Sequence, residues 1–419
     1  MNRLFALRQR EGEGGHLFWR LFDRKAPMAT MQKLRDYRGP ALLSHGFRPF
    51  FLFGAIYAGA AIPLWLATYA GHVSLPTAFA PRDWHVHEML FGYVSAVVAG
   101  FLLTAIPNWT GRLPIQGMPL ALLFGSWVAG RAAVSFSDVI GWETALAIDA
   151  AFLILLAAAA AREIVTGRKW NNLKVVAIVS LLAGSNVAFH IEAHITGLAE
   201  FSTRAGVALV VTLVCVIGGR IVPSFTRNWL ARRPPGRLPV TFNRFDGLAM
   251  VAGVCAMAAW VIDPTGRPTA VALAVAGLFH LARLVRWAGE RTFSDRLVLI
   301  LHVAYAFVPV GFFLSALSAV DLVAPGAGVH AWTGGAIGSM TIAVMTRASL
   351  GHTGQALRAS GLVQAVYAAV VVAALARVCA AVEPSHAVPL LAVSGIAWTF
   401  AFFGFAVAYA PLLCRTRKF

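Results

Sequence analysis

The chain of 419 residues is 58% hydrophobic and only 13% charged. Soluble domains carry about 25% charged residues, so this composition excludes an ordinary soluble domain and indicates an integral membrane protein. The net charge of +17 would suit a nucleic-acid binder, but the basic residues lie between apolar runs; membrane topology explains them better, and no nucleic-acid partner is expected.

Twelve apolar runs follow one another along the chain, most of them close to the roughly 20 residues that a membrane-spanning helix needs. They cover residues 50–70, 88–106, 119–136, 143–161, 173–195, 205–222, 246–263, 268–287, 296–318, 332–346, 361–382 and 388–410. We therefore predict an all-α polytopic membrane protein with twelve transmembrane helices. Residues 45–415 would form this single domain, preceded by a basic cytoplasmic segment at residues 1–44.

The links between the runs alternate in charge, and this alternation predicts the orientation. Lys and Arg are frequent in the N-terminal segment, in the C-terminal tail and in the links 162–172, 223–245 and 288–295. The alternate links hold only single basic residues, at Arg82, Arg204 and Arg267. Because cytoplasmic links carry the excess of Lys and Arg, both termini are expected in the cytoplasm.

Three similar run endings indicate an internal repeat. The second, sixth and tenth runs end with IPNWTGR (106–112), IVPSFTRNW (221–229) and AVMTRASLGHTG (343–354), each four runs after the one before. Repeats are common in membrane folds, and three repeats of four helices would form a ring with pseudo-threefold symmetry. The alternative is that short Thr-Arg endings recur by chance.

One group of histidines lies at the predicted outer ends of the second, fifth and tenth runs. It comprises His85, His87, His190, His194 and His330, with Glu88 and Glu192 beside them. Ionisable groups in a membrane are costly and usually functional, and neutral imidazole is a common metal ligand. We expect these histidines to bind metal; a His/Glu proton relay without metal is the alternative.

The two histidines of the HVH sequence cannot easily serve one metal ion. His85 and His87 are two residues apart, which is about 200° around a helix, so their side chains point to opposite sides. Such a helix can serve two neighbouring sites at once. His190 and His194 are four residues apart and share one helical face.

A second group of histidines lies nearer the cytoplasmic side. His280 and His302 share a depth in the inner third of their runs and are expected to bind a further haem or to shape a quinol pocket. His352 lies at the cytoplasmic edge, together with His45.

The donor types favour haem b over other metal centres. The four cysteines form neither CxxC nor CxxCH, so no disulfide framework, iron–sulfur site or c-type haem is expected, and no Cys/Met cluster for copper(I) is evident. Histidines on separate spans suit axial ligation of a non-covalently held haem. Its carboxylates need cations: Arg82 and Arg204 on the outer side, or Arg48, Arg112, Arg220, Arg227 and Arg347 at inner run ends. Ordinary positive-inside placement is the alternative explanation for the inner arginines.

Several segments in order resemble the NnrS family. They are GFRPFF (46–51), WHVHEMLFGY (84–93), AGFLLTAIPNWTGR (99–112), GGRIVPSFTRNWL (218–230), HLARLVRW (280–287), ILHVAYAFVP (300–309) and GSMTIAVMTRASLGHTG (338–354). The resemblance implies a twelve-span bacterial inner-membrane protein with haem, and with copper also reported, linked to nitric oxide metabolism and denitrification. The histidines that match by position are His85, His87, His190, His280, His302, His330 and His352; His194 and His45 depart from the family pattern.

The twelve spans, the possible threefold repeat and the H-x-H helix also resemble the haem–copper oxidase arrangement, at the level of the fold alone. We therefore expect a haem b protein, with two haems, that reduces nitric oxide with electrons from quinol or a partner protein. His85 and His87 would each serve one haem, and Glu88, or less favourably Glu192, would donate protons. The alternatives are a haem or copper protein that only binds nitric oxide, and a cofactor-free His/Glu relay transporter.

Overall fold

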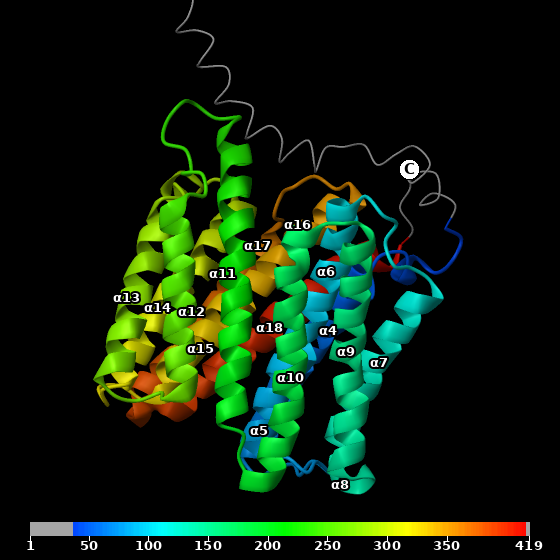
Figure 1. The fold of residues 1–419 in the computed structure, drawn as a ribbon, viewed down its shortest axis with the longest axis vertical. Coiled ribbons are helices and arrows are strands. Elements are labelled where there is room, and N and C mark those ends of the chain that lie inside the picture. The colour runs from blue at the N-terminus through cyan, green and yellow to red at the C-terminus, as the bar shows by residue number, and fades with distance from the viewer. Residues whose placement is uncertain (1–36, 416–419) are drawn as a thin grey trace, which may run out of the picture.

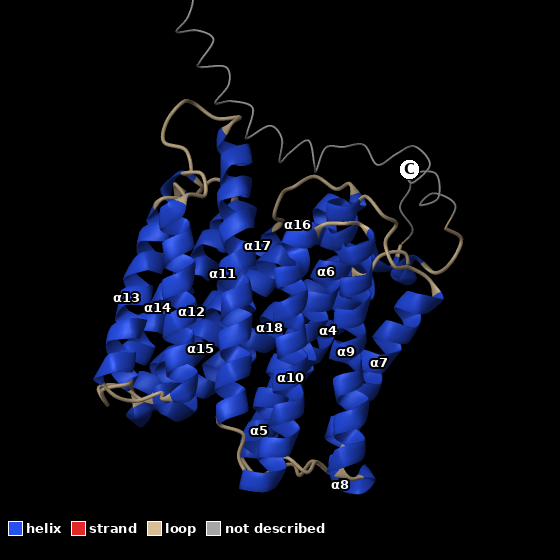
Figure 2. Cartoon of the chain, in the orientation of Figure 1, coloured by secondary structure: helices blue, strands red, loops and turns tan. Residues whose placement is uncertain are grey.

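The computed structural model describes residues 37–415, and within that range the chain is helical without any strand (Figures 1 and 2). The long helices run roughly along one direction and form a bundle. The first half contains α4 (Phe47–Tyr69), α5 (Pro81–His87), α6 (Ser95–Thr110), α7 (Met118–Ser135), α8 (Ser137–Ile140), α9 (Trp142–Thr166), α10 (Leu173–Thr196) and α11 (Phe201–Leu230). The second half contains α12 (Arg244–Ile262), α13 (Arg267–Val285), α14 (Arg296–Ser318), α15 (Pro325–His330), α16 (Ser339–Thr353), α17 (Gly361–Val382) and α18 (Ala387–Cys414).

Two π-helical segments and four short 3-10 turns complete the described chain. The π segments are η2 (Glu88–Val94) and η5 (Ala331–Gly338), and the 3-10 turns are η1 (Ala41–Leu43), η3 (Trp170–Asn172), η4 (Gly289–Arg291) and η6 (Pro384–His386). The predicted N-terminal segment 1–44 lies outside the described residues except for its last part, which contains η1.

Eleven helices in the described range are long and apolar enough to cross a membrane, which confirms a multi-pass membrane protein. They match the predicted runs with the exception of the tenth, 332–346. That run lies in a continuous helical stretch, residues 325–353, formed by α15, η5 and α16, and it is rich in Gly, Ser and Thr. The tenth span therefore remains a prediction.

The stretches α5–η2–α6 and α15–η5–α16 are built alike. Each begins at a proline, has a histidine as the last residue of its short first helix, and then continues through a π segment. Each ends before a glycine with positive φ, Gly111 at 73° and Gly354 at 75°. The sixth run is instead one uninterrupted helix, α11, so only two of the three proposed repeats contain a short helix followed by a π segment.

The helical stretch from α5 to α6 is the most deeply buried of the spans, with α14 next. Around them, α7, α9 and α10 pack on one another on one side, and α12, α13 and α14 on the other, while α17 and α18 pack with α4. Small residues allow this close packing. At Gly100, for example, a Cβ atom would lie 2.6 Å from the Phe51 ring and 3.3 Å from the backbone of Phe47.

The two ends of the bundle differ in composition. The basic loop 231–243 lies at one end, and α5 begins at the other end, called here the α5 end (Figure 1). Because α14 and α15 are joined by the short link 319–324, α15 also begins at the α5 end. Placement of the basic loops in the cytoplasm remains a prediction.

Candidate functional site

A cavity of about 620 Å³ lies at the α5 end, and His85 and His330 both line it. Its walls are mostly apolar side chains from α4, α5, η2, α11, η5, α17 and α18. Sites for small molecules and cofactors usually measure about 300–1,000 Å³ and are apolar with a few polar groups. The cavity therefore has the size and character of a cofactor site.

Both histidines of this cavity have few hydrogen-bond partners among the described residues. The His85 ring stacks on Trp65 with 4.2 Å between the ring centroids, and its Nδ1 is buried without a hydrogen-bond partner in the described chain. His330 Nδ1 lies 3.4 Å from the Thr333 hydroxyl, its one hydrogen-bond partner among residues 37–415. Two imidazoles from corresponding helices thus border one apolar space, where either could bind a metal.

Three arginines also line the cavity. Arg82 Nη1 lies 2.5 Å from Glu200 Oε1, and Arg204 Nη1 lies 3.8 Å from the other oxygen of Glu200. Arg377 forms no ion pair with any carboxylate in the described part of the chain. Guanidinium groups bind carboxylates through paired hydrogen bonds, so the cavity can hold an apolar molecule that carries carboxylates.

The sequence of the chain matches one protein family over nearly its whole length. The profile of the family described as NnrS protein matches residues 41–417, nearly the whole chain. The chain belongs to the NnrS family. Membership associates it with haem or metal binding and with nitric oxide metabolism. A comparison with curated proteins found no match.

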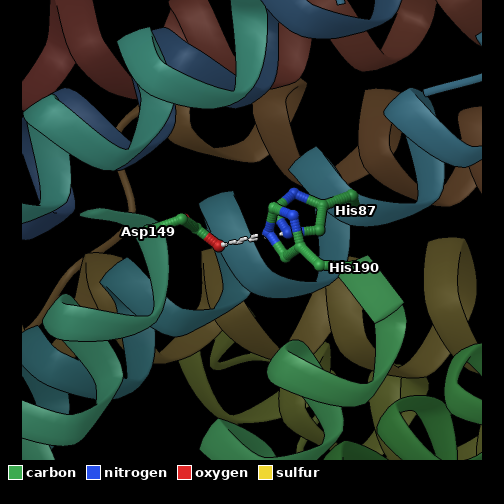
Figure 3. Close-up of side chains that lie close together, drawn as sticks. All are labelled: His87, Asp149 and His190. Carbon is green, nitrogen blue, oxygen red and sulfur yellow. Dashed lines mark hydrogen bonds and ion pairs between the residues drawn. The ribbon is translucent and has the colours of Figure 1, made fainter. Parts of the chain in front are cut away.

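A second group of polar residues in this NnrS-family protein contains His87, Asp149 and His190, whose side chains lie close together (Figure 3). None of the three lines the large cavity. His87 Nε2 and His190 Nε2 each lie 3.2 Å from Asp149 Oδ2, and all three residues are buried. Their ligand atoms lie within 4.8 Å of one another, so they could hold a metal ion. Two imidazoles and a carboxylate suit iron(II) or zinc. As helix geometry predicts, His85 and His87 face different sites.

Glu88 and Arg131 connect this group to a larger network. His87 Nδ1 lies 3.0 Å from Glu88 Oε1, and Arg131 Nη1 donates to Glu88 Oε2 at 2.6 Å. Arg131 Nη2 donates to Asp149, and the Tyr57 hydroxyl donates to Glu88. The network therefore contains two carboxylates and one guanidinium, all buried, and needs one further positive charge to be neutral.

The hydrogen bonds indicate where this charge resides. Both ring nitrogens of His87 face carboxylate oxygens, Glu88 on one side and Asp149 on the other, and carboxylates only accept hydrogen bonds. His87 satisfies both contacts when both nitrogens carry hydrogen, which makes it an imidazolium. Asn186 supports this arrangement, because its Nδ2 donates to Asp149 at 2.8 Å and its Oδ1 lies 2.9 Å from His87 Nε2.

The expectation of one haem on His87 does not fit the packing around its ring. His87 is fully buried between Phe79, Phe91 and Phe189, whose ring centroids lie 5.2, 5.3 and 5.3 Å from its own. A porphyrin would have to displace these rings. The His87 side of α5 can hold a proton or a single ion, whereas the His85 side has the space for a haem.

His194 and Glu192 lie apart from both sites. His194 is exposed and stacks on Trp142 at 4.2 Å, although it is only four residues from His190. The Glu192 carboxylate accepts hydrogen bonds from the backbone N–H groups of residues 200–202, at 2.8–2.9 Å, and so caps the start of α11. The structure thus gives Glu192 a role in holding the helix, and neither residue lines the cavity.

His280 and His302 have separate surroundings. His280 Nδ1 lies 2.9 Å from the Tyr305 hydroxyl, and the cavity beside its ring measures only about 10 Å³. That space holds one small atom or ion and excludes a porphyrin. His302 Nε2 lies 2.7 Å from the Thr226 hydroxyl, and within the described chain no hydrogen bond or ring contact joins the two histidines.

The inner residues proposed for haem carboxylates have other partners. Arg48 donates to the backbone carbonyl groups of Leu413 and Arg415, each at 2.8 Å, and Arg112 pairs with Glu163 at 2.5 Å. Arg347 lies over the Phe225 ring at 4.1 Å, and Arg227 donates to the Pro239 carbonyl group at 2.5 Å, whereas Arg220 is exposed. The His352 ring centroid lies 5.7 Å from that of Phe47. None of these residues lines the large cavity, in contrast to Arg82 and Arg204.

Sequence reasoning missed four important residues: Asp149, Arg131, Arg377 and Asn186. The first three are charged residues inside predicted apolar runs, and such residues usually have a function. That signal was available for them. The pairing of Arg131 with Asp149 and of Asn186 with His87 depends on how α7, α9 and α10 pack, which the sequence pattern does not reveal.

Proposed function

We propose that this NnrS-family protein holds haem b in the large cavity, acts on nitric oxide, and reduces it to nitrous oxide. The observation that carries the proposal is the apolar cavity of about 620 Å³ bordered by His85, His330 and three arginines. The unpartnered Nδ1 of His85, the cavity volume and the cationic rim all fit a haem.

Each lining residue has a defined part in this proposal. One of His85 and His330 would hold the iron, which leaves a position on the iron for nitric oxide, and Trp65 fixes the His85 ring by stacking. Arg377, with Arg82 and Arg204, would bind the two haem carboxylates. Haem iron, when bound, supplies a binding site for nitric oxide and a route for electrons.

The polar network behind α5 would supply protons. Reduction of two nitric oxide molecules to nitrous oxide and water consumes two electrons and two protons. Glu88 accepts a hydrogen bond from the imidazole of His87, which also donates to Asp149. We propose that the His87 imidazolium protonates Glu88 and that Glu88 then passes this proton toward the cavity.

Electrons would come from quinol or a partner protein, because the chain has no CxxCH for a c-type haem. An apolar groove of about 770 Å³ between α4, α17 and α18 adjoins the large cavity and shares Leu66 and Gly395 with it. A Cβ atom on Gly395 would lie 2.5 Å from Leu66, so the Leu66 side chain packs directly on Gly395 where the groove and the cavity share these two residues. This closeness supports a reactant that arrives through the bilayer, as nitric oxide and quinol both can.

The first test is an absorption spectrum and a haem assay of the purified protein. In the second test, the protein receives nitric oxide and reduced quinol without oxygen, and the nitrous oxide formed is measured. We expect a Soret band, which His85→Ala and His330→Ala reduce or shift, while the exposed control His194→Ala leaves it unchanged. Absence of the band in the unchanged protein refutes haem binding and favours a cofactor-free relay transporter. Haem without nitrous oxide formation favours a protein that binds nitric oxide without reducing it.

A further inference from the structure

The loop 231–243, between α11 and α12, lies at the end of the bundle opposite the α5 end and is fixed to its neighbours (Figure 1). The Val240 backbone N–H donates to the Arg286 carbonyl group at 3.0 Å. Arg291 Nη1 donates to the Arg237 carbonyl group at 2.6 Å. The loop therefore forms a defined surface together with the end of α13 and with η4.

The last part of this loop exposes apolar side chains. Leu238, Val240 and Phe242 are 43%, 44% and 66% exposed. Phe242 is two residues before the start of α12 at Arg244, and Val240 bonds the residue that follows α13, so these side chains lie where two spans reach the end of the bundle. Apolar side chains at this level suit the boundary between acyl chains and lipid headgroups.

The same surface carries a surplus of positive charge. Residues 227–246 and 283–296, called here the arginine surface, contain nine arginines and three carboxylates, a surplus of six positive charges. The carboxylates are already engaged, because Asp246 and Glu290 pair with arginines and Asp295 caps the start of α14. Within the described chain, four exposed arginines of this surface have no carboxylate partner: Arg232, Arg233, Arg244 and Arg296.

We propose that the arginine surface docks on anionic phospholipids of the surrounding bilayer. Guanidinium groups bind phosphate oxygens through paired hydrogen bonds, so the exposed arginines contact the headgroup phosphates. Leu238, Val240 and Phe242 contact the acyl chains next to these headgroups. A soluble anion would use the arginines alone, and a zwitterionic lipid gains little from the surplus charge, whereas an anionic lipid uses both features.

The lipid-facing side of α13 continues the apolar face away from the loop. Val285, Leu281 and Leu278 are exposed and are spaced four and three residues apart, so they form one stripe along the helix. Arg237 stands at the head of this stripe, because its Nη2 donates to the Val285 carbonyl group. An acyl chain can therefore lie along α13 while its phosphate stays beside Arg237.

The experiment measures the thermal unfolding midpoint of the full-length protein in detergent as phosphatidylglycerol or phosphatidylcholine is added, because a lipid that binds the folded state raises this midpoint. We expect phosphatidylglycerol to bind about tenfold more tightly than phosphatidylcholine. Arg232→Gln combined with Arg244→Gln should remove most of this preference, and neither side chain has a hydrogen bond within the described chain that the fold would lose. The matched control, Arg162→Gln combined with Arg168→Gln, changes two exposed arginines near the link between α9 and α10 and should keep the preference.

A second variant and a second ligand test the apolar part of the surface. Leu238→Ser combined with Phe242→Ser should weaken the binding of both lipids and keep the preference for phosphatidylglycerol. Glycerol 3-phosphate, which carries the charge without acyl chains, should leave the midpoint unchanged.

Three results would overturn the proposal. Equal binding of the two lipids would favour an acidic protein as the partner of this surface. Unchanged binding of phosphatidylglycerol in the variant of Arg232 and Arg244 would exclude these arginines as the site. Stabilisation by glycerol 3-phosphate equal to that by phosphatidylglycerol would indicate a site for soluble anions. None of these measurements depends on haem, so they test the arginine surface separately from the large cavity.

Discussion

Replacing Arg131 by methionine removes the guanidinium that pairs with Glu88 and Asp149 in the buried network around His87. Arg131 Nη1 lies 2.6 Å from Glu88 and Nη2 bonds Asp149, so the substitution leaves two carboxylates against one imidazolium. Removing one partner of a buried charge pair costs about 3–5 kcal/mol, because the remaining charge has no compensation. We expect Arg131→Met to lower the free energy of unfolding by that amount.

Restoring the neutrality of the network should recover the lost stability. Glu88→Gln in the Arg131→Met background removes one carboxylate, leaves one imidazolium and one carboxylate, and should regain most of the lost stability. A double-mutant cycle measured by thermal unfolding in detergent gives the coupling between the two residues. Arg162→Met is the control, because Arg162 is exposed, lies 3.9 Å from Glu163 and should contribute at most about 1 kcal/mol.

One result would refute the reasoning about charge. If Arg131→Met costs no more than Arg162→Met, the network does not depend on Arg131 for neutrality. A divalent ion bound to His87, Asp149 and His190 would produce that result, because such an ion already balances both carboxylates. Metal analysis of the same sample then separates a bound ion from a network in which a carboxylate is protonated.

Three further predictions concern single residues. Glu88→Gln should retain the haem spectrum and slow nitrous oxide formation at least tenfold, because the amide cannot donate a proton in turn; unchanged turnover refutes the proton role. Arg377→Gln should weaken haem retention during purification, measured as the ratio of haem to protein, whereas Arg358→Gln, at an exposed position, should not. Glu192→Gln should lower stability by about 1 kcal/mol, measured by thermal unfolding, without altering the haem spectrum, since it loses the charge that caps α11.

Hydropathy predicted the eleven long apolar helices of the described chain, because a lipid surrounding demands long apolar runs. The tenth run, 332–346, is helical throughout η5 and α16, but it contains many small polar residues, and its place as a span remains a prediction. Helix geometry also predicted that His85 and His87 face opposite sides, since this depends on local structure alone.

The sequence pattern could not predict the partners of these histidines. Asp149 contacts His87 from 62 positions away, and His280 of α13 lines one small cavity with Cys215 of α11. Such contacts depend on which faces of α9, α10, α11 and α13 pack together. The partners of the inner arginines depend on packing in the same way: Arg48 donates to the Leu413 carbonyl group, and Arg112 pairs with Glu163.

The π segments η2 and η5 have a consequence for how this protein tolerates insertions and deletions. A π segment carries more residues per turn than an α-helix, so it rotates the helix before it relative to the helix after it. Each residue of an α-helix corresponds to about 100° of rotation. Deleting one residue between Glu88 and Val94 would turn α5 by about that angle while α6 kept its packing, and His85 would leave the cavity wall. The length of η2 therefore sets the direction of His85 as strictly as the identity of the residue itself.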